Sequence, residues 1–473
     1  MNSKKTIFLT GASGNMGSAT VEHLLERTDR FQIKALVLPG ERENPRVQRL
    51  LQHTGLEVIW GDLTHYEDVL AGLSGADYVL HVGGMVSPYA DLFPDLAMRV
   101  NVGGARNIGS AIKAQDSPDQ IRLVYIGSVA QTGSRMPPIH WGRVGAPIKI
   151  SHFDQYAVSK TLAEAIIADS GLKYWVSLRQ TSMAHLGLHE IVDPISFHSP
   201  LNGVLEWSTA WDSGRLLANV CEESVPDSFW RHFYNIGGGA NSRLTNYEFM
   251  EKTYGAMGIS DLSKVLRPNW FATRNFHGQW YTDSDRLEAL VPFRSQSIDD
   301  FINMLKKNTP LHIKLVGRFA ASAIFWRTRS LAKSPGGSLH WLEHDETSHI
   351  DAFFESRDAW RSIPDWDAFT PAQPSRTPQF LNHGYEEKKP RESWTLSDMQ
   401  SAAEFRGGRF ISDHTDDAFK QYNWRCALGH NFTMSPNLML TGGHWCPTCM
   451  VDPKCYADVA RHSPFFAQVW QES

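Results

Sequence analysis

Short apolar runs alternate with helical patterns along the first part of the chain. The runs TIFLTG, IKALVL, LEVIWGD, DYVLHV and IRLVYIGS occupy residues 6–11, 33–38, 56–62, 77–82 and 121–128. Between them, apolar positions recur every three or four residues, as in SATVEHLLER, which is the spacing of amphipathic helices. Buried strands that alternate with helices predict an α/β fold with a doubly wound, parallel, Rossmann-type sheet.

The pattern changes further along the chain. Residues 181–310 are less regular and rich in tryptophan, and they predict a smaller substrate subdomain behind a cofactor part of about residues 1–180. The segment LHIKLVGRFAASAIFWRTRSLA then predicts a basic amphipathic helix, which we expect to pack on the body of the protein rather than on a membrane surface. Proline-rich and glycine-rich stretches predict a helix and an irregular linker arm over residues 311–395, ahead of a small domain over 396–473.

Length and charge limit the classes of partner. A chain of 473 residues exceeds the usual size of one core, so we expect more than one domain. The net charge is -5, and acidic and basic residues are mixed, so no nucleic-acid or membrane partner is expected. The N-terminal apolar run is too short for a signal peptide, and no apolar stretch reaches the length of a membrane span. We therefore expect a soluble, cytoplasmic protein.

Three glycines stand where the first strand should become the first helix. Gly11, Gly14 and Gly17 are spaced G-x-x-G-x-x-G in the stretch TGASGNMG. Glycines there allow a tight turn and a close approach of a pyrophosphate to a helix N-terminus, although a purely structural turn is the alternative. Neighbouring residues of this turn, of the ends of the third and fourth strands and of the next helix complete a predicted cofactor site: Ser13, Asn15, Met16, Asp62, Leu63, Val82, Gly83, Gly84 and Asn101.

Three further residues carry candidate chemistry. Ser128 ends the fifth apolar run, at the sheet edge where open α/β sheets bind ligands. Tyr156 and Lys160 follow in YAVSK, four residues apart and therefore on one face of a helix.

This order of motifs resembles the extended short-chain dehydrogenase/reductase family, which includes NAD-dependent epimerases and dehydratases and 3β-hydroxysteroid dehydrogenases. The resemblance covers about residues 5–305, and we assign residues 1–310 to such a domain. It implies that Tyr156 donates or accepts the proton, that the Lys160 cation favours its phenolate and holds the cofactor ribose, and that Ser128 orients the substrate oxygen. The resemblance also implies a homodimer formed through the helix of Tyr156 and its neighbour.

The chain departs from the family pattern near the cofactor. Leu38 and Pro39 stand where NAD enzymes usually have an aspartate for the ribose hydroxyls. Arg42 or Arg46 is available to a 2′-phosphate, so we expect NADP(H) to be favoured over NAD(H).

The substrate half decides between related activities. Val129 and Ala130 follow Ser128, where sugar-nucleotide dehydratases carry an acidic pair. The half is rich in aromatic residues, which are more often core than pocket, and shows no clear phosphate clamp. We expect an NAD(P)H-dependent oxidoreductase that reduces a carbonyl, or oxidises a secondary alcohol, of a mainly apolar or aromatic small molecule. The alternatives are a nucleotide-sugar epimerase or dehydratase with tightly bound NAD, and a non-catalytic protein that senses the cofactor.

Cysteines cluster near the end of the chain. Two soft-ligand pairs with short spacings, C-x3-H and C-x2-C, match a closed tetrahedral zinc site without a position for catalysis. The four ligands expected for structural Zn²⁺ are Cys426, His430, Cys446 and Cys449. His444 and Cys455 are alternative ligands, and buried thiols without metal are the other interpretation. The stretch resembles small zinc-ribbon or treble-clef modules, and we expect it to cap the substrate opening or to form a subunit interface.

Overall fold

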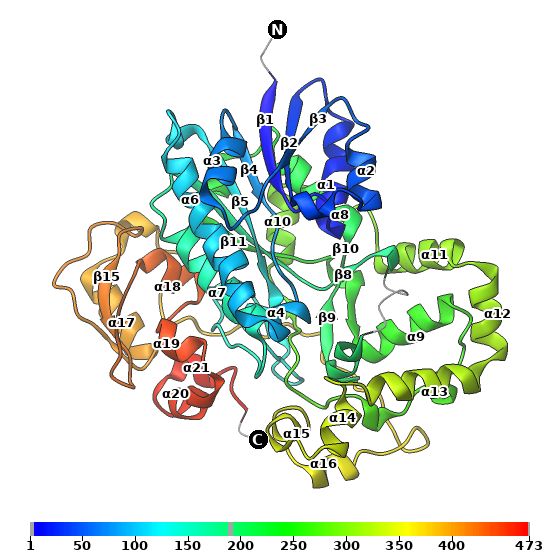
Figure 1. Ribbon diagram of the computed structural model, residues 1–473. Helices are drawn as coiled ribbons and strands as arrows, with labels where there is room; N and C mark the ends of the chain where they lie inside the picture. Colours follow the sequence, from blue (N-terminus) through cyan, green and yellow to red (C-terminus); the bar gives the residue numbers. More distant parts are fainter. Residues whose placement is uncertain (1–3, 188–192, 472–473) are drawn as a thin grey trace.

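The computed structural model describes residues 4–187 and 193–471. Within these residues, one parallel sheet has the strand order β11-β7-β5-β4-β1-β2-β3 (Figure 1). Its strands are β1 (Lys5–Thr10), β2 (Phe31–Val37), β3 (Leu56–Trp60), β4 (Tyr78–His81), β5 (Arg122–Ser128), β7 (Tyr174–Gln180) and β11 (His232–Ile236). The first five strands coincide with the five apolar runs of the sequence, which confirms the predicted α/β class.

Side chains of each strand alternate between two apolar layers. On β1, Phe8 faces one layer, whereas Ile7 and Leu9 face the other. Helices α3 (Tyr66–Leu73), α6 (Gly104–Lys113) and α7 (Gln155–Ala168) cover the Phe8 side, and α1 (Asn15–Leu25), α8 (Ala210–Val220) and α10 (Ser284–Leu290) cover the other. Because both faces are buried, the strands have continuous apolar sequences.

The order of the strands reverses between β1 and β4. Strands β2 and β3 follow on one side of β1, whereas β4, β5, β7 and β11 follow on its other side. In doubly wound sheets, ligands bind in the crevice that this reversal leaves at the carboxyl ends of the strands. The glycine turn after β1 and Ser128 at the end of β5 both lie at that edge.

The substrate half adds short strand pairs and two helices. The pairs are β8 (Met183–Ala184) with β10 (Ser208–Thr209), β9 (Val204–Glu206) with β12 (Arg243–Thr245), and β13 (Trp280–Tyr281) with β6 (Trp141–Gly142), which comes from the cofactor part; the helices are α9 (Asn246–Ala256) and α11 (Ile298–Asn308). Most of its aromatic residues are core residues: Trp207 stacks on Phe249 with ring centroids 3.6 Å apart, and Trp280 meets Trp141 of the cofactor part edge to face. They therefore do not argue for an aromatic substrate.

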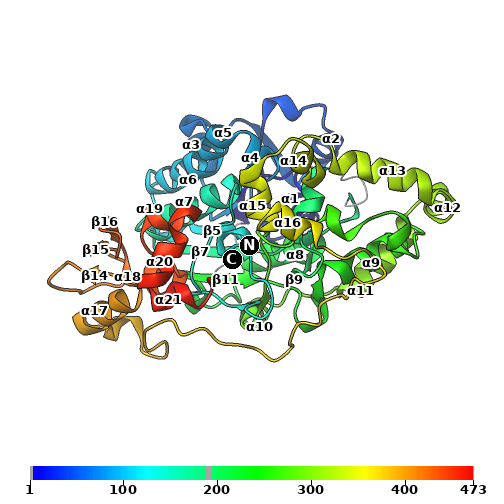
Figure 2. The ribbon, with the colours of Figure 1, turned by 90° about the horizontal axis from the view of Figure 1, so that it is seen from below.

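Five helices follow, namely α12 (Leu311–Phe319), α13 (Ala321–Ala332), α14 (Ser338–Glu343), α15 (Thr347–Phe354) and α16 (Arg357–Arg361). Helices α13 to α15 share an apolar cluster with residues 259–272 of the substrate half. The chain from about residue 362 to 390 then has no helix or strand, and Figure 2 shows it crossing the molecule towards α17. The domain boundaries expected from the sequence stay predictions.

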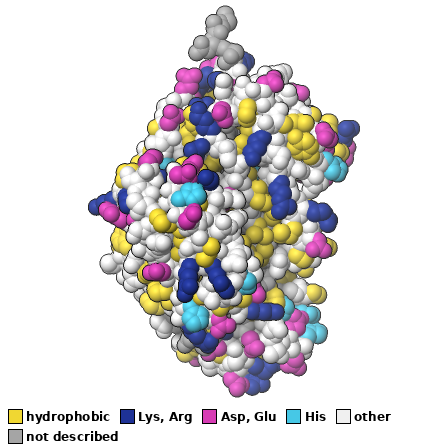
Figure 3. All heavy atoms as spheres, turned by 90° about the vertical axis from the view of Figure 1, so that its left-hand side faces the viewer, with side chains coloured by type: hydrophobic (Ala, Val, Ile, Leu, Met, Phe, Trp, Pro, Cys, Tyr) yellow, Lys and Arg dark blue, Asp and Glu magenta, His cyan; other side chains and the backbone are white. Residues whose placement is uncertain are grey.

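The C-terminal part is attached to the sheet domain. It comprises α17 (Leu396–Phe405), β14 (Arg409–Phe410), β15 (Tyr422–Arg425), β16 (Asn431–Met434), α18 (Pro436–Gly442), α19 (Pro447–Met450), α20 (Tyr456–His462) and α21 (Pro464–Ala467). Trp424 and Met439 belong to the same apolar cluster as Trp175 of β7 and Phe233 of β11. Figure 3, which views the molecule from this side, shows acidic, basic and apolar side chains interspersed, without a field of one charge.

Candidate active site and metal centre

The glycine turn is closely packed. Gly11 has a positive φ of 77°, and a Cβ atom there would lie 2.7 Å from the Cα of Gly83. A Cβ on Gly17 would lie 2.0 Å from the carbonyl oxygen of Gly11. Gly14 is the N-cap of α1 and offers no side chain to the first N–H groups of the helix. These free donors and the lack of Cβ atoms fit a dinucleotide pyrophosphate.

Several predicted cofactor residues are engaged in protein contacts. The Asn101 side chain accepts from the backbone N–H of Met85 (2.8 Å) and donates to the Met85 carbonyl (2.9 Å) and to Ser159 Oγ (2.8 Å). One oxygen of Asp62 accepts two hydrogen bonds from Thr64. Asn101 therefore positions the loop after β4 against α7 rather than presenting a free amide.

A carboxylate that sequence reasoning missed lies beside the glycine turn. Ser13 Oγ donates to Glu41 Oε1 at 2.9 Å, just beyond β2. Arg46 donates to the Ser13 carbonyl (3.1 Å) and to Asn15 Oδ1 (2.9 Å), while the Arg42 guanidinium lies 4.7 Å from the ring centroid of Trp60. The expectation of NADP(H) assumed that no acid stood at this edge, and Glu41 removes that assumption because its charge repels a 2′-phosphate.

The three predicted catalytic residues lie on the elements that the sequence indicated. Ser128 ends β5, and Tyr156 and Lys160 lie on the first two turns of α7. Asp91 Oδ1 accepts the Tyr156 backbone N–H at 3.1 Å, and Asp154 caps the helix. The Lys160 ammonium group lies 4.5 Å from the ring centroid of Tyr125.

The electrostatics of the pair differ from expectation. Burial raises the pKa of Tyr156 to about 12, and the Ser128 hydroxyl opposes this shift while Asp154 and Asp91 add to it. Burial lowers the pKa of Lys160 to about 7, and Glu164 one turn along offsets this shift only in part. The sequence predicts that the Lys160 cation lowers the pKa of Tyr156; in the structure desolvation dominates both groups instead.

A network of buried hydrogen bonds connects Ser128 to Glu164 of α7. The backbone N–H of Ser128 donates to Gln131 Oε1 (2.8 Å), and Gln131 Nε2 donates to Glu164 Oε1 (2.9 Å). Glu164 accepts further hydrogen bonds from Ser177 Oγ (2.6 Å), from Arg179 (2.6 and 3.0 Å) and from His444 Nε2 (2.8 Å).

Burial disfavours the Glu164 carboxylate, but Arg179 and His444 hold its pKa well below the ordinary range. The C-terminal part thus places the His444 side chain in the core against α7, where it meets Glu164.

The four favoured metal ligands meet in one cluster, with all ligand atoms within 4.8 Å of one another. The Sγ atoms of Cys426 and Cys449 are 3.8 Å apart, and His430 Nδ1 lies 3.2 Å from Cys449 Sγ and 3.6 Å from Cys446 Sγ. With a Zn–S bond of about 2.3 Å, the edge between two sulfur atoms of a tetrahedron is about 3.8 Å. The distances therefore fit tetrahedral zinc.

The two alternative ligands lie elsewhere. His444 is hydrogen-bonded to Glu164, and the Cys455 thiol lies 3.6 Å from Asp452 Oδ2.

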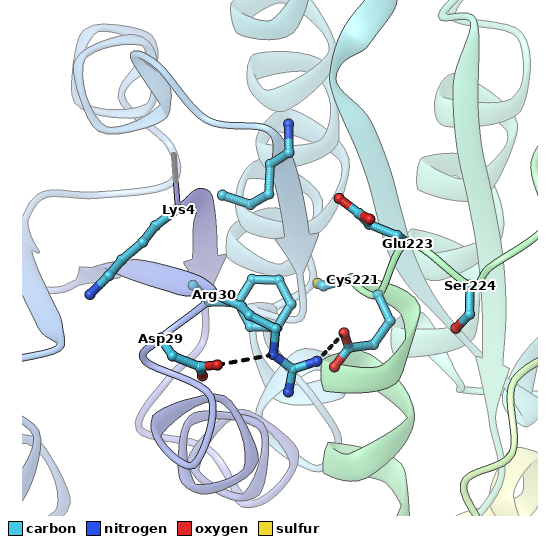
Figure 4. Close-up of a pocket in the computed structure, with 9 residues that line it drawn as sticks. Lys4, Asp29, Arg30, Cys221, Glu223 and Ser224 are labelled. Carbon is cyan, nitrogen blue, oxygen red and sulfur yellow. Dashed lines mark hydrogen bonds and ion pairs between the residues drawn. The ribbon is translucent and has the colours of Figure 1, made fainter. Parts of the chain in front are cut away.

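A cavity of about 680 Å³ opens at the opposite edge of the sheet, near the start of β1 and β2 (Figure 4). It is lined by charged residues of both signs, and Arg30 forms ion pairs with Asp29 and Glu222 there. None of the predicted site residues lines it. The cavity is therefore separate from the candidate active site.

Comparisons with known proteins agree with this arrangement. Residues 8–174 match the sequence model of the 3-beta hydroxysteroid dehydrogenase/isomerase family. The chain is 30% identical over 173 residues to human 3 beta-hydroxysteroid dehydrogenase type 7. The aligned region covers 35% of this chain and 45% of that protein. It is 29% identical over 110 residues to UDP-glucose 4-epimerase of Rickettsia typhi, covering 23% of this chain and 32% of that protein. The matches thus span less than half the length of either relative.

Solved structures show the same fold. A dTDP-glucose 4,6-dehydratase from Bacillus anthracis in complex with NAD aligns with a TM-score of 0.50 at 16% identity and covers 64% of this chain and 96% of its own. A double mutant of the enzyme from Streptomyces venezuelae, with NAD bound, aligns with a TM-score of 0.51 at 19% identity over 64% and 97%. Over residues 8–174 this chain is therefore similar in sequence to the 3-beta hydroxysteroid dehydrogenase/isomerase family, and its fold is the one seen in these two dehydratases.

Proposed function

We propose that this chain is an NAD(H)-dependent oxidoreductase that oxidises a secondary alcohol, or reduces a carbonyl, of an apolar small molecule. The observation that carries the proposal is an exposed apolar segment beside Tyr156. Val86, Tyr89, Leu92 and Phe93 are each more than half exposed on and around α4 (Tyr89–Leu92).

This α4 apolar segment, residues 86–93, adjoins the catalytic helix, because its Asp91 accepts the backbone N–H of Tyr156. Val129 and Ala130 behind Ser128 are buried and apolar, so this stretch offers no acid for a dehydration step. Exposed apolar patches often mark the place where an apolar ligand binds.

Ser128, Tyr156 and Lys160, the catalytic trio of this proposal, would carry out the proton transfer. A phenol with a raised pKa is protonated at neutral pH, so Tyr156 would donate the proton to a carbonyl oxygen that is being reduced. When an alcohol is oxidised, the deprotonated Tyr156 would take up the proton of the alcohol. The Ser128 hydroxyl, which interacts with Tyr156, orients that oxygen. Bound nicotinamide would donate or accept the hydride. Lys160, whose amine is buried beside Tyr125, would hold the cofactor ribose and stabilise charge near Tyr156.

The preferred dinucleotide follows from the residues at the end of β2. Glu41 lies against the glycine turn, Arg46 is bonded to that turn, and Arg42 stacks on Trp60. The Glu41 carboxylate can accept hydrogen bonds from free ribose hydroxyls but repels a 2′-phosphate, and both arginines already have protein partners. We therefore infer a preference for NAD(H) in place of the NADP(H) that the sequence favours. The two dehydratase structures with NAD bound support this inference.

A second candidate activity is epimerisation or dehydration of a nucleotide sugar. The relatives named UDP-glucose 4-epimerase and the fold shared with dTDP-glucose 4,6-dehydratases favour it. Such enzymes regenerate their cofactor within one turnover, so they cause no net change of nicotinamide absorbance.

One experiment separates these activities. The protein is mixed with NAD⁺ and, in turn, a 3β-hydroxysteroid, UDP-glucose or dTDP-glucose, while nicotinamide absorbance and product formation are followed. We expect NADH to accumulate with the steroid alcohol. A sugar-nucleotide product without net NADH would replace the first proposal with the second. Tight NAD⁺ binding without any product would indicate a cofactor-sensing protein and would refute both.

We also propose that Cys426, His430, Cys446 and Cys449 bind structural Zn²⁺. Four protein ligands complete a tetrahedron, which leaves no position for a catalytic water. The metal would hold the loop that carries His444 and thereby the buried network under α7. Zinc analysis of the purified protein tests this proposal, and protein that is fully folded after complete metal removal would oppose it.

A further inference from the structure

The segment that joins the substrate half to the rest of the chain carries charge of one sign. Residues 301–342 contain seven basic residues and no Asp or Glu. They are Lys306, Lys307, Lys314, Arg318, Arg327, Arg329 and Lys333. The chain as a whole has a net charge of -5, so this excess is local.

Helix α12 turns its apolar face outwards. Leu311, Leu315 and Phe319 recur at i, i+4 and i+8 and are 71%, 47% and 74% exposed. The opposite side packs through Gly317, where a Cβ atom would lie 2.3 Å from the Met257 carbonyl oxygen. This close contact fixes the orientation of the helix. The sequence predicts a helix that packs on the body of the protein, and α12 does so through Gly317, but its apolar side chains face outwards.

Helix α13 extends the same kind of surface. Ile324 and Phe325 pack inwards on the cluster of the substrate half, whereas Trp326 is 61% exposed. Cations accompany the outward aromatic rings: the Arg329 guanidinium lies 5.4 Å from the ring of Trp326, and that of Arg318 lies 5.5 Å from the ring of Phe319. An aromatic ring with an adjacent cation suits a layer that is apolar on one side and charged on the other.

Ion pairs of these cations are few in the part of the chain that the structure describes. Lys333 forms an ion pair with Glu343. Within residues 4–187 and 193–471, none of the other six forms an ion pair. A surface with several uncompensated cations and large exposed apolar side chains is complementary to lipid headgroups of negative charge over an apolar interior.

We propose that α12 and α13, which we call the α12–α13 surface, bind the interface of an anionic lipid bilayer. Leu311, Leu315, Phe319 and Trp326 enter the boundary between headgroups and acyl chains, and the flanking cations meet the lipid charge. Basic amphipathic helices of this kind lie in the plane of the membrane interface. None of the helices in the described part of the chain has the length and apolar character to cross a bilayer. Figures 1 and 2 place α12 at an outer corner of the molecule, remote from the C-terminal part, where a flat surface can reach it.

Vesicle co-sedimentation of the full chain tests the proposal. Vesicles of phosphatidylcholine mixed with phosphatidylserine are compared with vesicles of phosphatidylcholine alone. We expect binding to the anionic vesicles that weakens as salt is added. Replacing Arg318 and Arg327 by glutamine is expected to weaken binding about fivefold for each charge. Replacing Leu315 and Phe319 by serine is expected to weaken it at least about tenfold.

A matched control removes an equally exposed aromatic residue elsewhere. Phe380 is 71% exposed and lies outside this surface, so Phe380→Ser is expected to leave vesicle binding unchanged. All the substituted side chains are exposed, and circular dichroism confirms that each variant is folded. Equal binding to both kinds of vesicle, or undiminished binding of the Leu315→Ser/Phe319→Ser protein, would overturn the proposal. So would a second copy on this surface, seen as a doubled mass that Phe319→Ser abolishes without any vesicle binding.

Discussion

Replacing Glu164 by glutamine removes the charge at the centre of the buried network while almost preserving its shape. The carboxylate accepts five hydrogen bonds, and its partner Arg179 is 1% exposed. Glutamine keeps one oxygen but turns an amide N–H₂ group towards donors that need an acceptor. The guanidinium of Arg179 is then a buried charge without a counter-charge.

The expected cost follows from this geometry. Breaking a buried ion pair by removing one partner destabilises a protein by about 3–5 kcal/mol. We therefore expect the free energy of unfolding of Glu164→Gln to fall by about this amount, as measured by urea unfolding followed through tryptophan fluorescence. Glu67→Gln, an exposed change, is the matched control, with an expected effect below about 0.5 kcal/mol.

A double variant tests the cause. If the loss comes from the uncompensated guanidinium, adding Arg179→Met removes that charge, and the double variant is less destabilised than the sum of the single variants. Additive losses, or a loss below about 1 kcal/mol for Glu164→Gln, would refute the reasoning. Because Gln131 links Glu164 to Ser128, we also expect the single variant to lose turnover more than cofactor affinity.

Three further predictions concern the charges and the metal. The folded-state pKa of Lys160 is about 7 against 10.5 for the free side chain, so the unfolded chain binds more protons between these values. The free energy of unfolding should therefore rise with pH in that window, by up to about 1.4 kcal/mol per pH unit, and the rise should be smaller in Lys160→Met; equal slopes would contradict the shift. Wild-type protein should contain about one zinc per chain by mass spectrometry and Cys446→Ser much less, together with a lower melting temperature; equal zinc contents would exclude this site. Glu41→Ser should raise NADPH affinity relative to NADH in calorimetric titrations, and an unchanged ratio would show that Glu41 does not select the cofactor.

Local patterns made the fold and the positions of the trio predictable. Strands with both faces buried have continuous apolar sequences, and the crowding at Gly11 and Gly17 is the physical reason for the glycine spacing that the sequence shows. Gln131 also left a signal, because Ser128 and Gln131 form a capping box with its usual three-residue spacing.

Long-range contacts were not predictable in this way. His444 and Glu164 are 280 residues apart, and nothing local indicates that they meet. The outward face of α12 and the effect of burial on Tyr156 and Lys160 depend on tertiary packing, which a single sequence does not encode locally. The homodimer and the cytoplasmic location stay predictions.

The proposed oxidoreductase activity depends on the Tyr156 phenol, which exchanges a proton beside a dinucleotide at the carboxyl edge of the sheet. The direct test compares wild-type protein with Tyr156→Phe, measuring NADH affinity by calorimetry and turnover with the substrate identified in the absorbance assay. We predict unchanged affinity and a turnover at least about 100-fold lower, because the variant lacks only the proton donor. Wild-type turnover in the variant, or no NADH binding by either protein, would contradict the account.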